Sequence, residues 1–180
     1  EAWPKWRAVD YGYAVPYACV WMTRDPAGRI YLYRESYGSG KTALDQAYEV
    51  RVLSGDERYF CTVGDPAMWA DQREGKRYQS VASQYGEMGV GLIQASNNRI
   101  AGWNRLHEVL AFGDEVPPIL RVFSTCHDFI RTFPMLTRHP NKPDDVNTLD
   151  VALEDHLADA ARYAIQAAPW LDAQTRRGPQ

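Results

Sequence analysis

The sequence predicts a mixed α/β domain whose sheet begins antiparallel and continues with parallel strands. Three observations predict this fold class. Three strand-like segments follow one another at the start of the chain, helical and strand-like segments then alternate, and a long amphipathic helix closes the chain. Because 180 residues suit one domain, we predict a domain at residues 1–168 and a C-terminal tail at 169–180.

The first third of the chain is predicted to be an antiparallel meander. Segments 6–12, 15–23 and 29–36 are rich in Val, Ile and Tyr, which favour strands. The DPAG motif at 25–28 contains the residues typical of a tight turn. Strands joined by such short connections pair antiparallel.

The middle of the chain alternates between helix-like and strand-like patterns. We predict helices at 42–53, 77–89 and 99–112, and strands at 59–63, 90–95 and 119–124. A helix between two strands of one sheet makes a crossover that leaves those strands parallel. Breaker residues predict a surface loop at 137–149, and an apolar stripe predicts a final helix at 151–168.

The charge balance argues against a protein that holds DNA by bulk charge alone. The 20 Lys and Arg residues and 23 Asp and Glu residues give a net charge of −3, whereas phosphate binding depends on Lys and Arg. A metal-dependent nuclease remains compatible with this balance, because its carboxylate cluster is negative until cations fill it. Three widely spaced cysteines suggest neither a disulfide framework nor a zinc site, so we expect the protein in a reducing cytosol. No apolar stretch is long enough for a membrane span, so we expect no membrane partner.

Acidic residues stand at the ends of two predicted strands. Asp10 and Asp65 each follow a pair of apolar residues, Ala8-Val9 and Val63-Gly64. If those strands are parallel neighbours, both carboxylates lie at one edge of the sheet, where a divalent cation would relieve their repulsion. Asp155 and Asp159 are four residues apart on the final helix, with His156 beside them, and either Asp could complete the site. The alternative for each aspartate is a turn or helix-cap role, and for His156 a packing role.

Four segments resemble the nuclease domain of the large terminase subunit of tailed bacteriophages and prophages. They are VDYGYAVPYACVWMTRDPAGRIYLYRE from residue 9, VGDPA from 63, ASNNRIAGW from 95 and EDHLADAARYA from 154. The resemblance covers nearly the whole chain, and the pattern DHxxDAxRY is its most specific element. It implies an RNase H-like fold and a metal-dependent endonuclease that cuts concatemeric viral double-stranded DNA during genome packaging.

The resemblance also implies a set of site residues. The three metal-binding acids of the family fall on Asp10, Asp65 and Asp159, which would hold Mg²⁺ or Mn²⁺ as a two-metal site. His156 matches a histidine found near the metals in a subset of the family. Asp155 remains the rival third ligand, because the register of a helix is not settled by the sequence.

The partners and the location follow from the same resemblance. It implies an ATPase domain of the same full-length protein, a small terminase subunit and a portal protein, in the cytoplasm of the bacterial host at the procapsid portal. Two sets of basic residues are candidates for the DNA backbone or for plain solvated surface: Arg73, Lys76 and Arg77, and Arg131, Arg138 and Lys142. Residues 97–99 are either helix caps or part of the DNA-binding face.

Two other function classes stay open at this stage. An RNase H-like Holliday-junction resolvase or integrase would share the fold, and a non-catalytic docking domain for the packaging machine would need no metal. The GSGKT motif at 38–42 lacks the first glycine of a phosphate-binding loop, because Glu35 occupies that position; Thr42 is predicted to be a helix N-cap. His107 and the Cys126-His127-Asp128 run lie in no recognisable nucleophile motif.

Overall fold

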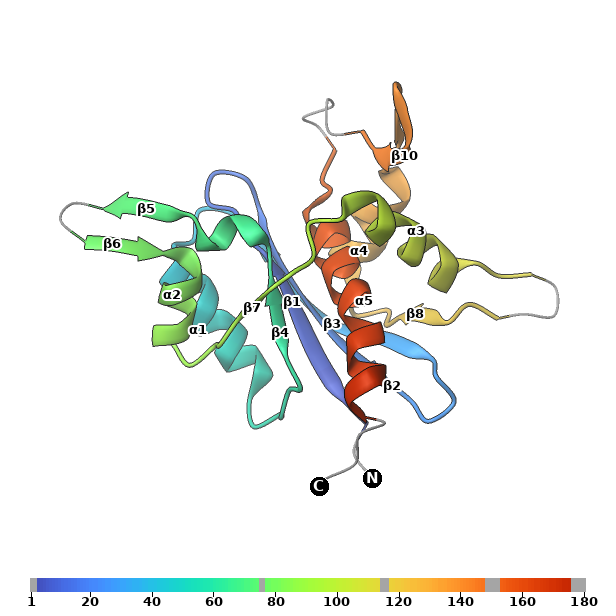
Figure 1. The fold of residues 1–180 in the computed structure, drawn as a ribbon, viewed down its shortest axis with the longest axis horizontal. Helices are drawn as coiled ribbons and strands as arrows, with labels where there is room; N and C mark the ends of the chain where they lie inside the picture. The colour runs from blue at the N-terminus through green and yellow to red at the C-terminus, as the bar shows by residue number, and fades with distance from the viewer. Residues whose placement is uncertain (1–2, 75–76, 114–116, 148–152, 176–180) are drawn as a thin grey trace.

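The computed structural model describes residues 3–74, 77–113, 117–147 and 153–175. Its centre is a mixed six-stranded sheet with the strand order β7-β4-β1-β2-β3-β8 (Figure 1). The strands are β1 (Lys5–Asp10), β2 (Tyr17–Arg24), β3 (Ile30–Gly38), β4 (Thr62–Gly64), β7 (Ile93–Gln94) and β8 (Leu120–Val122). The mixed α/β class predicted from the sequence is confirmed.

The strand directions also follow the prediction. β1, β2 and β3 form the antiparallel meander, and β4 and β7 continue the sheet in parallel from β1. β8 pairs in parallel with β3 at the other edge. The parallel strands are short, with two or three residues each. The strand expected at 59–63 is shorter than predicted, because β4 begins only at Thr62.

Helices cover both faces of the sheet (Figure 1). The helices are α1 (Ala43–Ser54), α2 (Val81–Glu87), α3 (Arg99–Leu110), α4 (His127–Thr132) and α5 (His156–Thr175), with 3₁₀ turns η1 (Pro66–Trp69) and η2 (Phe133–Met135). α1 and α2 pack on one face, whereas α3, α4 and α5 pack on the other. In the described part of the chain, no helix combines the length and the apolar character that crossing a membrane requires.

The two faces of β1 serve two separate cores. Trp6 and Ala8 point toward α5 and α3, while Val9 points toward α1 and α2. This division follows from the alternation of side chains along a strand. The residues of β1 therefore fix both helical layers relative to the strand that ends at Asp10.

The first helix begins as the sequence predicts. The hydroxyl of Thr42 accepts a hydrogen bond from the backbone N–H of Asp45, and the Asp45 carboxylate accepts one from the N–H of Thr42. This reciprocal pair is a capping box, which satisfies backbone donors that a helix start leaves free. Thr42 is thus a cap, and the GSGKT motif follows the third strand of a meander rather than forming a phosphate loop.

Two predictions of secondary structure are wrong. Residues 77–80 form strand β6, which pairs with β5 (Asp71–Glu74), and α2 starts only at Val81 after its N-cap Ser80. The predicted loop at 137–149 contains a hairpin of β9 (Arg138–His139) and β10 (Lys142–Val146). Both are small two-stranded sheets outside the main sheet, and strands of this kind carry little hydrophobic periodicity.

The ends of the final helix also differ from the prediction. Residues 153–155 are not helical, and α5 runs from His156 to Thr175. The helix therefore continues into the segment predicted as a tail from residue 169. The helix α4 and the turn η2 were not predicted from the sequence, since six and three residues are too short for a clear helical pattern.

α3 and α5 approach each other closely at one glycine. A Cβ atom added to Gly102 would lie 2.6 Å from Cγ of Arg162. Glycine in a helix interior costs stability, so it is expected where two helices need the space of a side chain. The approach brings the start of α3 beside the first turns of α5, where the predicted site residues lie.

Candidate active site

Asp10 and Asp65 lie side by side at the carboxyl edge of the sheet, as the sequence predicts. Val9 is level with Gly64 across the parallel β1–β4 pair, and the backbone N–H of Asp65 donates to the carbonyl of Val9 at 3.0 Å. Asp10 ends β1 and Asp65 follows β4 directly. Parallel strands end at one edge, and this edge is where open α/β sheets place their ligands.

A local cap fixes the side chain of Asp65. Its carboxylate accepts a hydrogen bond from the backbone N–H of Ala67 at 2.9 Å, and Pro66 starts the 3₁₀ turn η1. The cap role considered for this residue therefore exists. It does not compete with a site role, because one oxygen of the carboxylate caps the turn and the other is not used by that bond.

Asp10 is paired with His156, the first residue of α5. Nδ1 of His156 lies 2.9 Å from Oδ2 of Asp10, whose residue is 6% exposed. Burial raises the pKa of Asp10 to about 7; the hydrogen bond from His156 opposes this shift, and the charges of Asp159 and Asp65 add to it. The same hydrogen bond raises the pKa of His156. The pKa of the Asp10 carboxyl is therefore close to neutral pH, and that of His156 is raised by the same contact.

We predict that the metal-free protein loses stability as the pH rises from about 5 to about 8. Asp10 has a higher pKa folded than unfolded, so the folded state holds a proton that the unfolded state has released, and this stabilisation disappears as the pH passes 7. The raised pKa of His156 acts in the same direction. Urea unfolding with a chelator at several pH values measures the effect. Asp10→Asn should flatten the dependence, and a wild-type stability that increases over this range would contradict the assignment.

Asp159 is held by two arginines from different helices. Nη1 of Arg99 donates to both carboxylate oxygens of Asp159, at 3.0 and 2.9 Å, and Nε of Arg162 donates to Oδ1 at 2.9 Å. Asp159 lies on the first turn of α5 and its charge influences the pKa of Asp10. The structure therefore brings the first two aspartates and Asp159 together at one edge of the sheet.

Asp155 is near this group but is not on the helix. Its carbonyl accepts the hydrogen bond from the N–H of Asp159 at 2.8 Å, so Asp155 precedes the first turn of α5. The expectation that Asp155 and Asp159 share a helix face is wrong. Burial and the charge of Asp159 still raise the pKa of Asp155, and Nη2 of Arg99 lies 3.8 Å from its carboxylate. Asp155 therefore lies beside Asp159, and the guanidinium of Arg99 is near both carboxylates.

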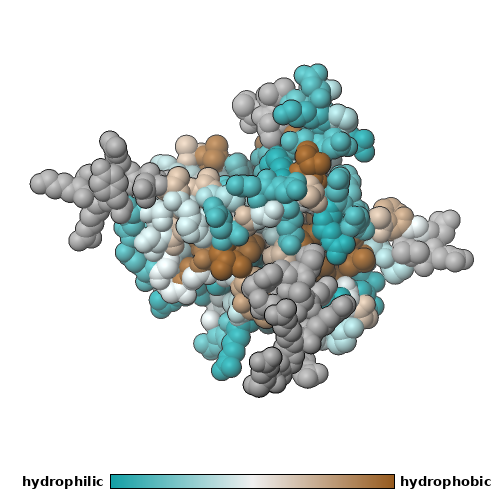
Figure 2. All heavy atoms as spheres, in the orientation of Figure 1, coloured by the Kyte–Doolittle hydropathy of each residue, from teal (hydrophilic) through white to brown (hydrophobic). Residues whose placement is uncertain are grey.

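The roles of Arg99 and Asp145 were not predicted from the sequence. Nε of Arg99 donates to Oδ1 of Asp145 at 2.8 Å, and Nε1 of Trp103 donates to the same oxygen at 2.9 Å. The guanidinium of Arg99 therefore neutralises carboxylates from α5 and from β10. The surface over α3 and β10, at the upper right of Figure 2, is mostly hydrophilic. Asn98 caps α3 by accepting from the N–H of Ala101, which settles the cap role left open for this segment.

The donors at this edge are carboxylates, but the described residues contain no group of three or more His, Cys, Asp or Glu side chains arranged to hold a metal ion. Each carboxylate already has a protein partner: His156 for Asp10, the η1 backbone for Asp65 and arginine for Asp159. Hard carboxylate oxygens are the ligands that Mg²⁺ and Mn²⁺ prefer.

The predicted basic residues that the structure describes lie on three parts of the fold: α4, the β9–β10 hairpin and the β5–β6 hairpin. Arg131 forms ion pairs with Asp128 and Glu154, so its charge is balanced locally. Arg138 and Lys142 are exposed on β9 and β10. Arg73 and Arg77 lie on β5 and β6, and Lys76 lies outside the described residues.

Solved structures with a similar arrangement of helices and strands include large terminases of bacteriophages. The P22 large terminase nuclease domain aligns with a TM-score of 0.69 and 22% identity, over 93% of this chain and 82% of that one. This chain has the fold of a large terminase nuclease domain. The nuclease of thermophilic phage G20c aligns at 0.62 with 12% identity, over 90% of this chain and 81% of that one. The predicted RNase H-like class is thereby confirmed.

The terminase nuclease fold is also found within longer proteins. The full large terminase of another thermophilic bacteriophage aligns with a TM-score of 0.73 and 16% identity, over 93% of this chain. The chain spans 40% of the length of that protein. No protein-family model and no curated protein matches the sequence.

Proposed function

We propose that this chain is a divalent-metal-dependent endonuclease that cuts concatemeric viral double-stranded DNA during genome packaging. The convergence of Asp10, Asp65 and Asp159 from three separate elements, in a terminase nuclease fold, carries the proposal. Three carboxylates at the ligand edge of such a sheet are a common arrangement for phosphodiester hydrolysis. Fold alone does not determine function, so the site residues bear the argument.

Asp10, Asp65 and Asp159 are the residues proposed to hold Mg²⁺ or Mn²⁺, and the family resemblance implies two ions. Bound metal would supply an activated water and neutralise the charge that develops on the phosphate. The chain's own residues prepare the site. His156 orients the Asp10 carboxylate through its hydrogen bond, and Arg99 holds Asp159 in place while balancing its charge.

We further propose that the domain works beside an ATPase domain of the same full-length protein. The alignment with the longer thermophilic phage terminase covers 40% of that protein. That terminase has been solved in complex with ADP and with ATP-gamma-S. A small terminase subunit and a portal protein, in the cytoplasm of the bacterial host, are the other proposed partners. These follow from the family resemblance.

Plasmid cleavage tests the proposed function and separates the two candidates for the third ligand. We expect nicking and linearisation with Mn²⁺ or Mg²⁺, and none with EDTA, because hydrolysis at neutral pH needs the metal. Asp65→Asn and Asp159→Asn should each abolish cleavage and weaken Mn²⁺ binding measured by calorimetry. Asp155→Asn should retain cleavage, because the family resemblance assigns the third metal ligand to Asp159 and Asp155 lies directly before α5 rather than on it.

The matched control is Asp144→Asn, which removes an exposed carboxylate on β10. Loss of cleavage in Asp155→Asn together with retained cleavage in Asp159→Asn would reverse the assignment of the third ligand. Retained cleavage in both Asp65→Asn and Asp159→Asn would contradict the proposed function. A preference for branched over linear DNA would favour a junction resolvase instead.

A further inference from the structure

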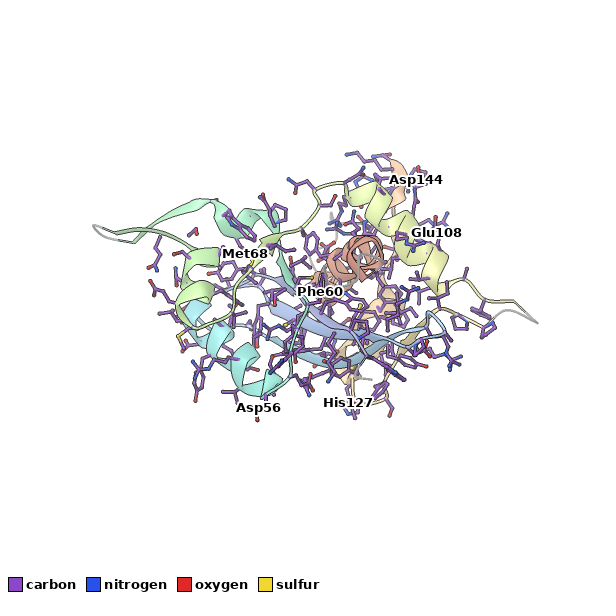
Figure 3. The ribbon with its side chains drawn as sticks, turned by 60° about the horizontal axis from the view of Figure 1, so that its bottom comes forward. Asp56, Phe60, Met68, Glu108, His127 and Asp144 are labelled. Carbon is purple, nitrogen blue, oxygen red and sulfur yellow. The ribbon has the colours of Figure 1, made fainter. Side chains whose placement is uncertain are left out.

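We propose that a second pocket, remote from the acidic edge, binds a phosphoryl group. The pocket lies between the end of α1, the segment before β4 and the turn before β7, and has a volume of about 480 Å³. The lining residues used in the argument are Arg7, Arg51, Ser54, Glu57, Tyr59 and Thr62. Asp56 and Phe60, labelled in Figure 3, mark the segment that connects α1 to β4 beside it.

Arg7 is a buried cation without an acidic partner. It is 7% exposed, its Nε donates to Oγ1 of Thr62 at 3.0 Å and its Nη1 donates to Oγ of Ser54 at 2.5 Å. Its guanidinium lies 4.2 Å from the ring centroid of Tyr59. Among the described residues no carboxylate forms an ion pair with Arg7. Burying an unpaired charge is costly, so an anion from outside the chain would complete this site.

The groups around Arg7 do not supply the missing negative charge. Burial lowers the pKa of Arg7, and the titratable groups that oppose this shift are two cysteines and two tyrosines, which are neutral at pH 7. Glu57 lines the same pocket, but its carboxylate already pairs with Lys5 at 3.4 Å and with Arg34 at 3.0 Å. The two hydroxyl groups that accept hydrogen bonds from Arg7 are neutral, so they leave its charge uncompensated.

A second arginine indicates the class of anion. Arg51 lies in the last turn of α1, is exposed and lines the same pocket, and the described part of the chain provides no ion pair for it. Guanidinium groups match phosphate geometry through paired hydrogen bonds, and two of them suit a dianion. The ligand chemistry is therefore a phosphoryl group. Its source would be free phosphate, a nucleotide or the terminal phosphate of a DNA end.

This pocket is separate from the acidic edge. Arg7 and Asp10 are three residues apart on β1, which corresponds to about 10 Å along a strand and to opposite faces of the sheet. Arg7 lies under α1, whereas Asp10 pairs with His156 of α5. A phosphate bound at Arg7 would thus be distinct from a scissile phosphate at the aspartates.

Calorimetry of the wild-type protein with inorganic phosphate, against sodium chloride at matched ionic strength, tests the proposal. We expect saturable phosphate binding in the absence of divalent metal, weakened roughly tenfold or more by Arg51→Gln and by Arg7→Gln, because each removes a charge-assisted hydrogen bond. Arg58→Gln is the matched control, since Arg58 is exposed on the same segment but does not line the pocket. Arg51→Gln keeps the test valid if Arg7→Gln does not fold.

Titrations with AMP and with oligonucleotides that carry or lack a 5′-phosphate identify the source of the phosphoryl group. Competition by inorganic phosphate would place these ligands in the same pocket. No phosphate binding by the wild-type protein, or binding unchanged in Arg51→Gln, would overturn the proposal. Plasmid cleavage by Arg51→Gln should remain at the wild-type level. The outcome of the phosphate-binding test is therefore independent of the proposed nuclease function.

Discussion

Asp10→Asn is expected to abolish metal-dependent DNA cleavage, by roughly a thousandfold or more, while the protein stays folded. Asp10 is the most buried of the site's aspartates and is coupled to both Asp65 and Asp159. Asparagine keeps the shape of the side chain but removes the negative charge that a cation needs. Initial rates of plasmid nicking at saturating Mn²⁺ measure the effect, and circular dichroism verifies the fold.

Asp56→Asn provides the control for this experiment. Asp56 is an exposed aspartate at the end of α1, on the far side of the molecule from β10 (Figure 3). Its replacement should leave the nicking rate unchanged. A nicking rate in Asp10→Asn within about tenfold of the wild type would show that the carboxylate of Asp10 is dispensable, and the proposed site would then be wrong.

Trp6→Ala is expected to reduce the free energy of unfolding by about 3–5 kcal/mol. Trp6 is fully buried between β1 and α5, and its Nε1 donates to the carbonyl of Ala164 at 3.0 Å. The substitution leaves a cavity and removes the buried hydrogen bond that the indole N–H donates to α5. Because α5 carries His156 and Asp159, this contact ties the stability of the core to the position of the site.

Urea unfolding of Trp6→Ala and Trp3→Ala provides the comparison. Trp3 is 44% exposed and stacks on Tyr31 with ring centroids 5.7 Å apart, so its replacement should cost about 1 kcal/mol or less. Trp6→Phe should fall between the two, since it retains most of the apolar volume but loses the indole N–H. Equal losses for Trp6→Ala and Trp3→Ala would mean that β1 is not anchored through α5.

The charges of the candidate active site are balanced by basic groups of the chain itself. His156 pairs with Asp10, and Arg99 forms ion pairs with Asp159 and Asp145. Arg99 also lies near the carboxylate of Asp155, at a longer distance. Such balance offsets the repulsion among converging carboxylates in the absence of metal. It also explains why the net charge of −3 carried little information about the site, since the acids and their counter-ions act locally.

The amino-acid sequence by itself determined the elements whose signals are local. Strand propensity marked the meander, and the Thr42 capping box marked the start of α1. Short apolar pairs followed by Asp10 and Asp65 marked two strand ends. The right-handed crossover rule then predicts that those two aspartates lie at one edge of the sheet, and the parallel β1–β4 pair confirms it. These features depend on a few neighbouring residues, so a pattern reveals them.

Tertiary structure alone decided the contacts between distant segments. It placed Asp155 before α5 rather than on it, joined Arg99 to residues 46 and 60 positions away, and left Arg7 buried beside Ser54 without an acid. The β9–β10 hairpin likewise has a weak local pattern and is tied to α3 by Asp145. Side-chain pairing across such separations depends on how helices and strands pack, and no spacing along the chain encodes it.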